Sequence, residues 1–203
     1  MESWPILPDA PLDTGGPDSE AFLRVGCGSY RSAARYLHQL PYGRNAERAD
    51  FRLVLAERRG TCSTKQALLA AVALEQKLPV SLTIGIYDMA EANTPGVGSV
   101  LSARGLESIP EAHCYLRYAG RRVDITRSGV SPHAPIDYLH QEWTIEPAQI
   151  GEHKVALHQQ YLHGWLRERP ALRFSFEEIW RIREACIAAL GAAVSAPTEV
   201  RRS

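Results

Sequence analysis

The sequence lacks the features that would direct the protein to a nucleic acid or to a membrane. Its 23 Lys and Arg residues balance 23 Asp and Glu residues, so the formal net charge at pH 7 is +0. Such a balance gives no general attraction to nucleic acid or to an anionic lipid surface. No apolar run approaches the roughly 18 residues that a membrane-spanning helix needs. We therefore expect neither partner for this chain.

Cysteine is also scarce. The four cysteines, at positions 27, 62, 114 and 186, lie far apart in the sequence, which does not indicate a disulfide framework. The first twenty residues lack the basic region followed by an apolar stretch that is typical of a secretory signal. A reducing, cytoplasmic location is therefore the simplest expectation.

The remaining composition is typical of a globular protein. The 203 residues are 45% hydrophobic and 23% charged, which is enough apolar sequence for a sizeable core. The N-terminal stretch is rich in Pro, Gly and Asp, and the last residues carry no clear pattern. We expect a flexible arm over residues 1–17, a single domain over 18–194, and a disordered tail over 195–203.

Hydrophobic periodicity predicts an α+β fold, with helices before and after a small antiparallel sheet. Ser29 precedes a helical pattern that ends at Pro41, and an alanine-rich run predicts a helix that begins at Thr61 or Cys62. The β-rich run 80–87 predicts a strand. The further elements expected are a short helix around residues 51–59, a loop over 91–110, a hairpin over 111–126, a helical stretch over 147–167 interrupted by Gly151 and Gly164, and a final helix over about 176–194 with a Ser175–Glu178 capping box.

Cys62 is the most informative residue because of its place at the start of the alanine-rich helix. Unpaired N–H groups and the helix dipole at an N-terminus favour a thiolate over a thiol. The apolar body of the helix would hold the sulfur on a rigid element. A buried, inert cysteine would suit the same position, so the stretch alone leaves both interpretations open.

His113 and Asp124 lie on the two arms of the expected hairpin. With a two-residue loop at Ala119-Gly120, Tyr118 faces Arg121, and His113 and Asp124 become diagonal neighbours on one face of the sheet. An odd number of loop residues would place them on opposite faces unless a bulge compensates. The same alternation turns Cys114 toward the core as a small buried hydrophobe.

The segments GTCSTKQALLAA and EAHCYLRYAGRRVDIT resemble the transglutaminase-like superfamily of papain-like cysteine enzymes, over roughly residues 40–126. Those enzymes have a cysteine at the start of a core helix, then a histidine and an aspartate on neighbouring antiparallel strands. The resemblance implies a papain- or transglutaminase-like core in which the catalytic helix packs on a small antiparallel sheet, here with additional C-terminal helices. It also implies Cys62 as nucleophile, His113 as general base and acid, and Asp124 as the carboxylate that orients the histidine, with no cofactor and no metal.

The implied chemistry is acyl transfer from a peptide, protein or small-molecule amide or ester through a thioester, as in peptidases, amidases, deamidases and transglutaminases. Ser63 stands where crosslinking transglutaminases carry an aromatic residue, so protein crosslinking is not the default expectation. The backbone N–H of Cys62 is a natural oxyanion donor, and Tyr42 and Asn45 are candidates for a second donor. We expect the pocket walls to come from the 88–110 loop, the 127–136 loop and the C-terminal helices.

Two other functions remain open. The segment RRGTC is similar to the RGG-x-C segment of arylamine N-acetyltransferases, which use Cys, His and Asp in the same order and take acyl groups from acyl-CoA. The second alternative is a domain of the same fold that only binds, because a fold does not fix a function.

Other polar and aromatic residues favour simpler interpretations. His153, His158 and His163 are five residues apart, so they do not converge on one face of a helix to bind a metal. Three residues in a loop-like stretch, His133, Asp137 and His140, could bind zinc. The favoured interpretation is that they bind no metal. The basic residues near Cys62 are expected on a solvated face: Arg58, Arg59 and Lys65. The aromatic residues near the C-terminus are expected in the core: Trp165, Phe174, Phe176 and Trp180.

Overall fold

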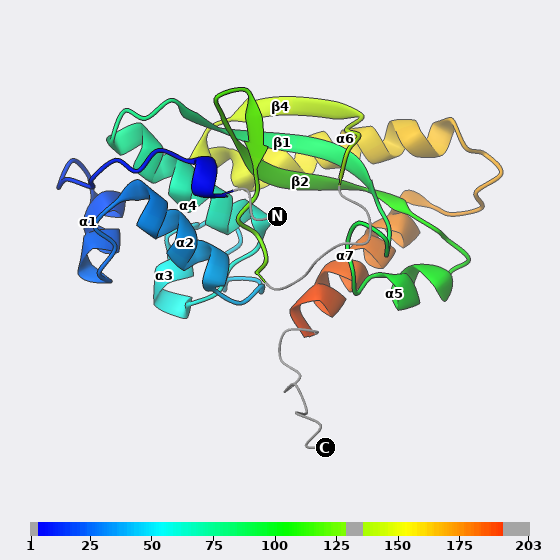
Figure 1. Ribbon diagram of the computed structural model, residues 1–203. Helices are drawn as coiled ribbons and strands as arrows, with labels where there is room; N and C mark the ends of the chain where they lie inside the picture. The colour runs from blue at the N-terminus through cyan, green and yellow to red at the C-terminus, as the bar shows by residue number, and fades with distance from the viewer. Residues whose placement is uncertain (1–3, 129–135, 193–203) are drawn as a thin grey trace, which may run out of the picture.

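The computed structural model describes residues 4–128 and 136–192 and contains a four-stranded antiparallel sheet, which runs across the top of the view in Figure 1. The strand order is β3-β2-β1-β4. The strands are β1 (Val80–Met89), β2 (Ile109–Tyr118), β3 (Arg121–Val123) and β4 (Gln141–Ile145). β1 and β2 pair along their whole length, so together they form a rigid platform beneath the site.

Helix α4 (Cys62–Glu75) packs against β1 and β2 and is covered by the helices of the N-terminal part of the chain. Every residue from Cys62 to Ala73 is buried. Residues 67–73 of this helix are apolar on all sides, which is typical of a helix that is enclosed in this way. The covering helices are α1 (Pro17–Arg24), α2 (Tyr30–Gln39) and α3 (Leu53–Glu57).

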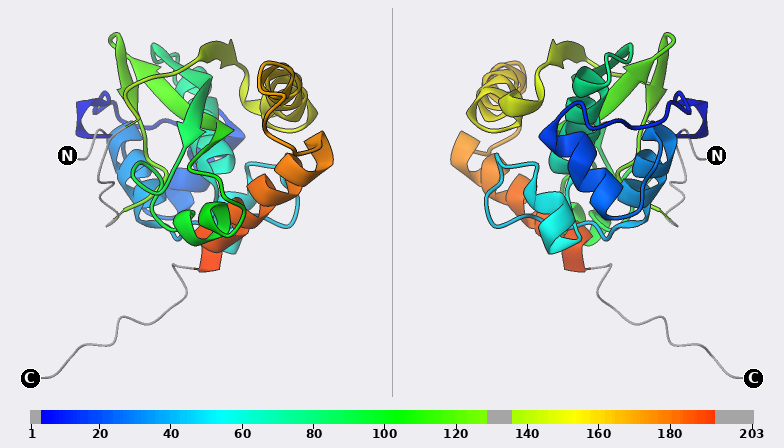
Figure 2. Two further views of the ribbon diagram at one scale, coloured as in Figure 1. Left: turned by 90° about the vertical axis from the view of Figure 1, so that its right-hand side faces the viewer. Right: turned by 90° about the vertical axis from the view of Figure 1, so that its left-hand side faces the viewer.

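The C-terminal helices form a second packing unit. A 3₁₀ turn (Pro147–Ile150) leads into α6 (Glu152–Arg167), which packs against α7 (Phe176–Ala192), and both helices contact β2. The short helix α5 (Gly98–Ser102), within the β1–β2 connection, packs on α7. Figure 2 shows α6 and α7 on one side of the molecule and α1 and α2 on the other, so the sheet and α4 lie between two groups of helices.

The β2–β3 hairpin has the register expected from the sequence. Tyr118 pairs with Arg121 and Leu116 with Val123, which leaves Ala119 and Gly120 as a two-residue loop. Their φ angles of 48° and 74° are both positive, as a type I′ turn requires. The prediction of an even loop is therefore confirmed.

Most other predicted elements are also confirmed, and so is the capping box predicted at the start of the last helix. Ser29 and Thr61 cap α2 and α4, and Ser175 and Glu178 exchange hydrogen bonds at the start of α7. Among the described helices, none is long and apolar enough to cross a lipid bilayer. The coarse class, α+β with a small antiparallel sheet and C-terminal helices, is therefore established.

Four local expectations differ from the structure. Part of the stretch expected to be a flexible arm is packed: Leu7 is fully buried, and η1 (Trp4–Ile6) contacts α2. α5 interrupts the expected 91–110 loop, and Gly164 does not interrupt α6. β4 was not predicted, because polar and apolar residues alternate over only four of its positions, 142–145, and only its last residue is buried. The expected tail, residues 195–203, lies outside the described residues.

Candidate active site

Cys62 is held rigidly at the first position of α4. Its N-cap, Thr61, forms a capping box with Thr64, and the Thr64 hydroxyl donates to Asn45 Oδ1 over 2.8 Å. These contacts fix the turn that leads into the helix. The Cys62 side chain therefore lies at the positive end of a buried helix of 14 residues. Only 8% of the residue is exposed to solvent.

His113 and Asp124 meet beside the edge of the sheet. His113 projects from β2, Asp124 follows the last residue of β3, and 2.6 Å separates His113 Nε2 from Asp124 Oδ2. The second carboxylate oxygen accepts hydrogen bonds from the side chain of Gln66 (2.9 Å) and the backbone N–H of Thr126 (2.8 Å). Since both oxygens are engaged, the carboxylate has a fixed direction toward the imidazole.

The imidazole of His113 also lies near the thiol of Cys62, close enough for each group to shift the pKa of the other. The three sequence-predicted residues thus come together in a line, with His113 between Cys62 and Asp124. Their approach depends on the two-residue hairpin turn and on the packing of α4 against β2.

The electrostatics of this line favour an ion pair. Burial would raise the pKa of the Cys62 thiol, but the positive charges of Lys154 and His113 outweigh burial and lower that pKa to about 6. Burial would lower the pKa of His113, but Asp124 and Cys62 raise it well above its usual range. At neutral pH the pair therefore rests as thiolate and imidazolium.

Asp124 stays ionised throughout the neutral range. Partial removal of water from its carboxylate would raise the pKa, but the charge of His113 and the donors of Thr126 lower it to about 2. The side chain remains 43% exposed, so removal of water is incomplete and solvent screens part of the attraction.

A buried lysine that the sequence did not single out lies next to Cys62. Lys154, on α6 and 7% exposed, donates a hydrogen bond of 2.7 Å to the hydroxyl of Ser63. That hydroxyl oxygen is 3.9 Å from the sulfur of Cys62 and 3.7 Å from that of Cys114. Burial would lower the pKa of Lys154, but Cys114, Cys62 and Glu111 raise it, so the side chain stays an ammonium group.

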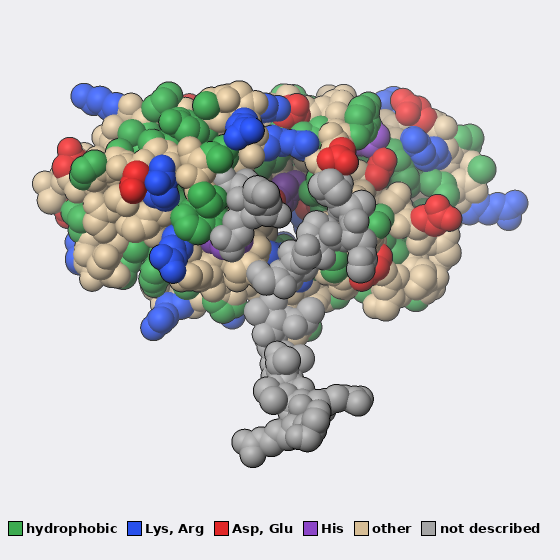
Figure 3. Space-filling model, viewed as in Figure 1, with side chains coloured by type: hydrophobic (Ala, Val, Ile, Leu, Met, Phe, Trp, Pro, Cys, Tyr) green, Lys and Arg blue, Asp and Glu red, His purple; other side chains and the backbone are tan. Residues whose placement is uncertain are grey.

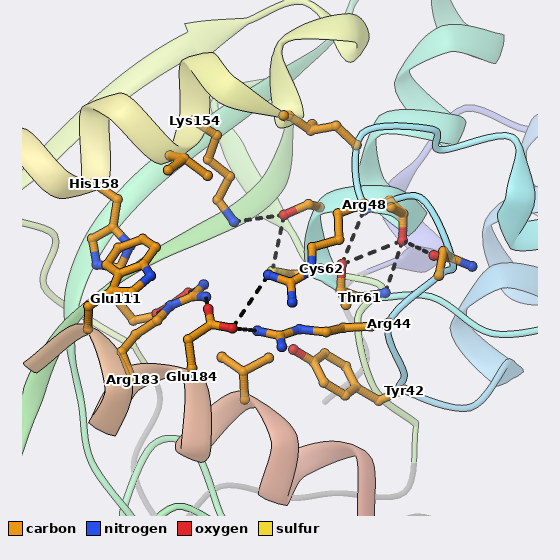
Figure 4. Close-up of a pocket in the computed structure, with 18 residues that line it drawn as sticks. Tyr42, Arg44, Arg48, Thr61, Cys62, Glu111, Lys154, His158, Arg183 and Glu184 are labelled. Atoms are coloured by element: carbon orange, nitrogen blue, oxygen red, sulfur yellow. Dashed lines mark hydrogen bonds and ion pairs between the residues drawn. The ribbon is translucent and has the colours of Figure 1, made fainter. Parts of the chain in front are cut away.

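Cys62 opens into a pocket between α4, α6, α7 and the residues that follow α2 (Figure 4). The space between the lining side chains, including its open mouth, is about 740 Å³. The labelled lining residues are Tyr42, Arg44, Arg48, Thr61, Cys62, Glu111, Lys154, His158, Arg183 and Glu184. The expectation that the C-terminal helices form a wall is confirmed, but the 88–110 loop does not line this pocket.

Two carboxylates organise the basic side chains of the pocket. Arg183 binds Glu111 through two hydrogen bonds of 2.7 Å, and the side chains of this pair are only 13% and 4% exposed. Glu184 receives Arg183 at 2.6 Å, Arg44 at 2.8 Å and Arg48 at 3.4 Å. Elsewhere, on the face shown in Figure 3, acidic and basic side chains are interspersed, and no broad area of one sign is visible among the described residues.

The structure separates the two candidates for a second oxyanion donor. The amide nitrogen of Asn45 already donates to Glu57 and to the backbone oxygen of Arg59, so it is not available. Tyr42 lines the pocket with Cys62, and burial raises the pKa of its hydroxyl far above the usual value. Its hydroxyl therefore keeps its proton.

Lys65 corrects another expectation. It was expected on a solvated face, but it is fully buried and donates to the backbone oxygens of Leu40 (2.5 Å) and Thr126 (2.9 Å). These bonds tie the segment after Asp124 to α4, so Lys65 supports the position of the carboxylate. Its neighbours Arg58 and Arg59 are exposed, as expected.

The remaining expectations concern metals, core residues and aromatic residues. Within residues 4–128 and 136–192, no group of three His, Cys, Asp or Glu residues is placed to hold a metal ion. His133, named above as part of a possible zinc group, lies outside the described residues. Cys114 is fully buried, and the four C-terminal aromatic residues pack in or against the second apolar cluster, as expected.

Comparison with protein-family models, with curated proteins and with solved structures gave no match to this chain.

Proposed function

We propose that the protein is a cysteine enzyme that transfers an acyl group from an amide or ester through a thioester intermediate. The observation that carries this proposal is the line formed by the Cys62 thiol, the His113 imidazole and the Asp124 carboxylate. A thiolate at a helix N-terminus, a histidine that can exchange its proton, and a carboxylate that orients the histidine are the parts that nucleophilic catalysis needs.

The proposed reaction begins when the Cys62 thiolate attacks the substrate carbonyl carbon. The carbonyl π electrons move to oxygen, and the backbone N–H of Cys62 and the hydroxyl of Tyr42 stabilise the resulting oxyanion. The intermediate collapses to a thioester as the bond to the leaving group breaks, and His113 gives its proton to the departing nitrogen or oxygen. Water or an amine then attacks the thioester, His113 accepts its proton, and the thiolate is released.

Two alternatives make different chemical demands on the same residues. An acyl-CoA transferase of the arylamine N-acetyltransferase type would load Cys62 from a CoA thioester and pass the acyl group to an arylamine. A binding domain of this fold would use the pocket without any covalent step. The activation of the Cys62 thiolate, with a pKa of about 6, favours the covalent readings over simple binding.

The first experiment measures alkylation of each cysteine by iodoacetamide as a function of pH, by mass spectrometry of the digested protein. We expect Cys62 to react with an inflection near pH 6, and His113→Ala to move the inflection upward. Cys27 and Cys186 are internal controls, because burial raises the pKa of both thiols. If Cys62 alkylates no faster at pH 6–7 than an ordinary thiol, the enzyme proposal fails.

The second experiment separates the covalent alternatives. The protein is incubated separately with p-nitrophenyl acetate, acetyl-CoA or a peptide mixture, quenched in acid, and analysed for an acyl group on Cys62. Loading from the ester or a peptide supports the proposed function, whereas loading from acetyl-CoA alone supports the acyl-CoA alternative. Cys62→Ser is the control, because it replaces the thiol with a hydroxyl that does not ionise at neutral pH.

A further inference from the structure

The pocket beside Cys62 contains more positive than negative side chains. Four of its lining residues carry a positive charge: Arg44, Arg48, Lys154 and Arg183. Two carry a negative charge, Glu111 and Glu184, and His158 is held neutral because burial lowers its pKa. Even with the Cys62 thiolate included, cations exceed anions. This excess is local, since the chain as a whole has a formal net charge of +0.

The excess is concentrated on two arginines. Arg183 is satisfied on its own, because it binds Glu111 through two hydrogen bonds and also reaches Glu184. Arg44 and Arg48, in contrast, converge on a single oxygen, Oε2 of Glu184 (Figure 4). A guanidinium has five N–H donors in a planar fork, so one shared oxygen leaves most donors of this pair without a carboxylate from the described residues.

The two arginines lie in the same pocket as Cys62, so their excess positive charge can act on a molecule that binds there. Arg44 and Arg48 belong to the segment between α2 and α3, and both line the same pocket as Cys62. The Arg48 side chain is 64% exposed and the Arg44 side chain 28% exposed, so a molecule that enters from solvent can reach both. The contacts with Glu184 show that both guanidinium groups can bind a carboxylate oxygen.

We propose that this pocket selects substrates that carry a free carboxylate close to the scissile amide or ester, and that Arg44 and Arg48 bind that carboxylate. This assignment rests on the proposed function, because it places the carboxylate so that the neighbouring carbonyl lies over Cys62. The substrate class is therefore a small acidic amide or a peptide end with its free carboxylate. Bidentate guanidinium–carboxylate contact fixes both the orientation and the distance of such a group.

The test compares two alkylating reagents that differ in one charge, iodoacetate and iodoacetamide. In each, the Cys62 sulfur attacks the methylene carbon, a C–S bond forms, and iodide leaves. We take the rate constant for iodoacetate divided by that for iodoacetamide. In this ratio the thiolate fraction cancels, so the ratio measures the attraction of the pocket for a carboxylate. We expect Arg48→Gln and Arg44→Gln each to lower this ratio about two- to tenfold, and added salt to lower it in the wild type.

Two further variants sharpen the comparison. Glu184→Gln removes the carboxylate that occupies the arginines, so we expect it to change the ratio in the opposite direction. Arg35→Gln removes one exposed arginine of α2 that does not line the pocket, and it should leave the ratio unchanged. Equal ratios in the wild type, Arg44→Gln and Arg48→Gln, or an equal fall in Arg35→Gln, overturn the carboxylate site.

The outcome separates this assignment from the proposed function. Slow reaction of Cys62 with both reagents contradicts the activated nucleophile itself. Fast reaction with iodoacetamide, without any influence of the two arginines on the ratio, leaves the enzyme proposal standing and removes the carboxylate site. A protection assay identifies the anion: glutarate should slow alkylation of the wild type and lose this effect in Arg48→Gln, whereas protection by inorganic phosphate alone overturns the carboxylate in favour of a phosphate group.

Discussion

Replacing Lys154 by Met tests whether the buried ammonium group activates the nucleophile. The methionine keeps most of the length of the side chain and removes the charge. Lys154 Nζ lies 2.7 Å from Ser63 Oγ, and that oxygen lies 3.9 Å from Cys62 Sγ. The two contacts in series place the Lys154 ammonium within about 7 Å of the Cys62 thiolate. At this distance Coulomb's law, with an effective dielectric constant of about 20, gives an attraction of roughly 2 kcal/mol.

An interaction of this size corresponds to one to two pKa units, about 1.4 kcal/mol each. The pKa of Cys62 should therefore rise from about 6 to roughly 7–8 in the variant. At pH 7 the thiolate fraction then falls from about nine-tenths to between about one-half and one-tenth. We expect alkylation by iodoacetamide at pH 7 to slow by about two- to ninefold, with near-equal rates at pH 9.

The assay is the pH profile of Cys62 alkylation, and the matched control is Lys77→Met. Lys77 is exposed just beyond the end of α4, so its removal changes the net charge equally without touching the site. Thermal unfolding of each variant identifies loss of structure separately from loss of activation. An unchanged inflection in folded Lys154→Met would refute the reasoning, because no other buried side chain in the described part of the pocket supplies the same charge to Ser63.

Three further predictions follow from the ion pairs and buried donors. Asp124→Asn should raise the pKa of the nucleophile, because the amide no longer stabilises the imidazolium of His113, and the alkylation profile should shift upward. Glu111→Gln removes the bidentate partner of Arg183, which then keeps only its contact with Glu184, and should cost about 1–3 kcal/mol in chemical denaturation. The pKa of Glu111, which burial would raise, is lowered to about 2 mainly by Arg183, so the contribution of the pair is present above pH 4.5 and is lost as pH falls toward 2. Lys65→Met leaves two buried backbone oxygens without a donor and should lower stability by about 1–3 kcal/mol, measured as the fall in Tm.

Local rules accounted for the parts of the site that lie on regular elements. Thr61 as an N-cap placed Cys62 at the first position of α4, and Ala119-Gly120 as a two-residue turn placed Asp124 within reach of His113. In both cases the controlling contact lies within a few residues of the functional group. Capping and hairpin register are determined by such short-range geometry, which is why the sequence predicts them.

The parts that were missed depend on long-range packing. Lys154 meets Ser63 across 91 positions of sequence, and Arg44 meets Glu184 across 140. Neither pair lies within a periodic pattern, and a lysine on an amphipathic helix is more often solvated than buried. Lys65 shows the same limit: its burial depends on carbonyls from Leu40 and Thr126, which no local pattern brings together.

The missed residues also explain why the low pKa of Cys62 depends on the C-terminal helices. Helix α4 and the hairpin supply Cys62 and His113, but the cation that lowers the thiol pKa comes from α6, and the basic wall of the pocket includes Arg183 from α7. α6 and α7 contact the strand that carries His113, so their docking brings Lys154 to Ser63. Burial alone would raise the pKa of Cys62, and the thiol would then stay protonated at neutral pH. The activation of the thiolate therefore depends on the packing of the C-terminal helices, and a reactive Cys62 reports that this packing is complete.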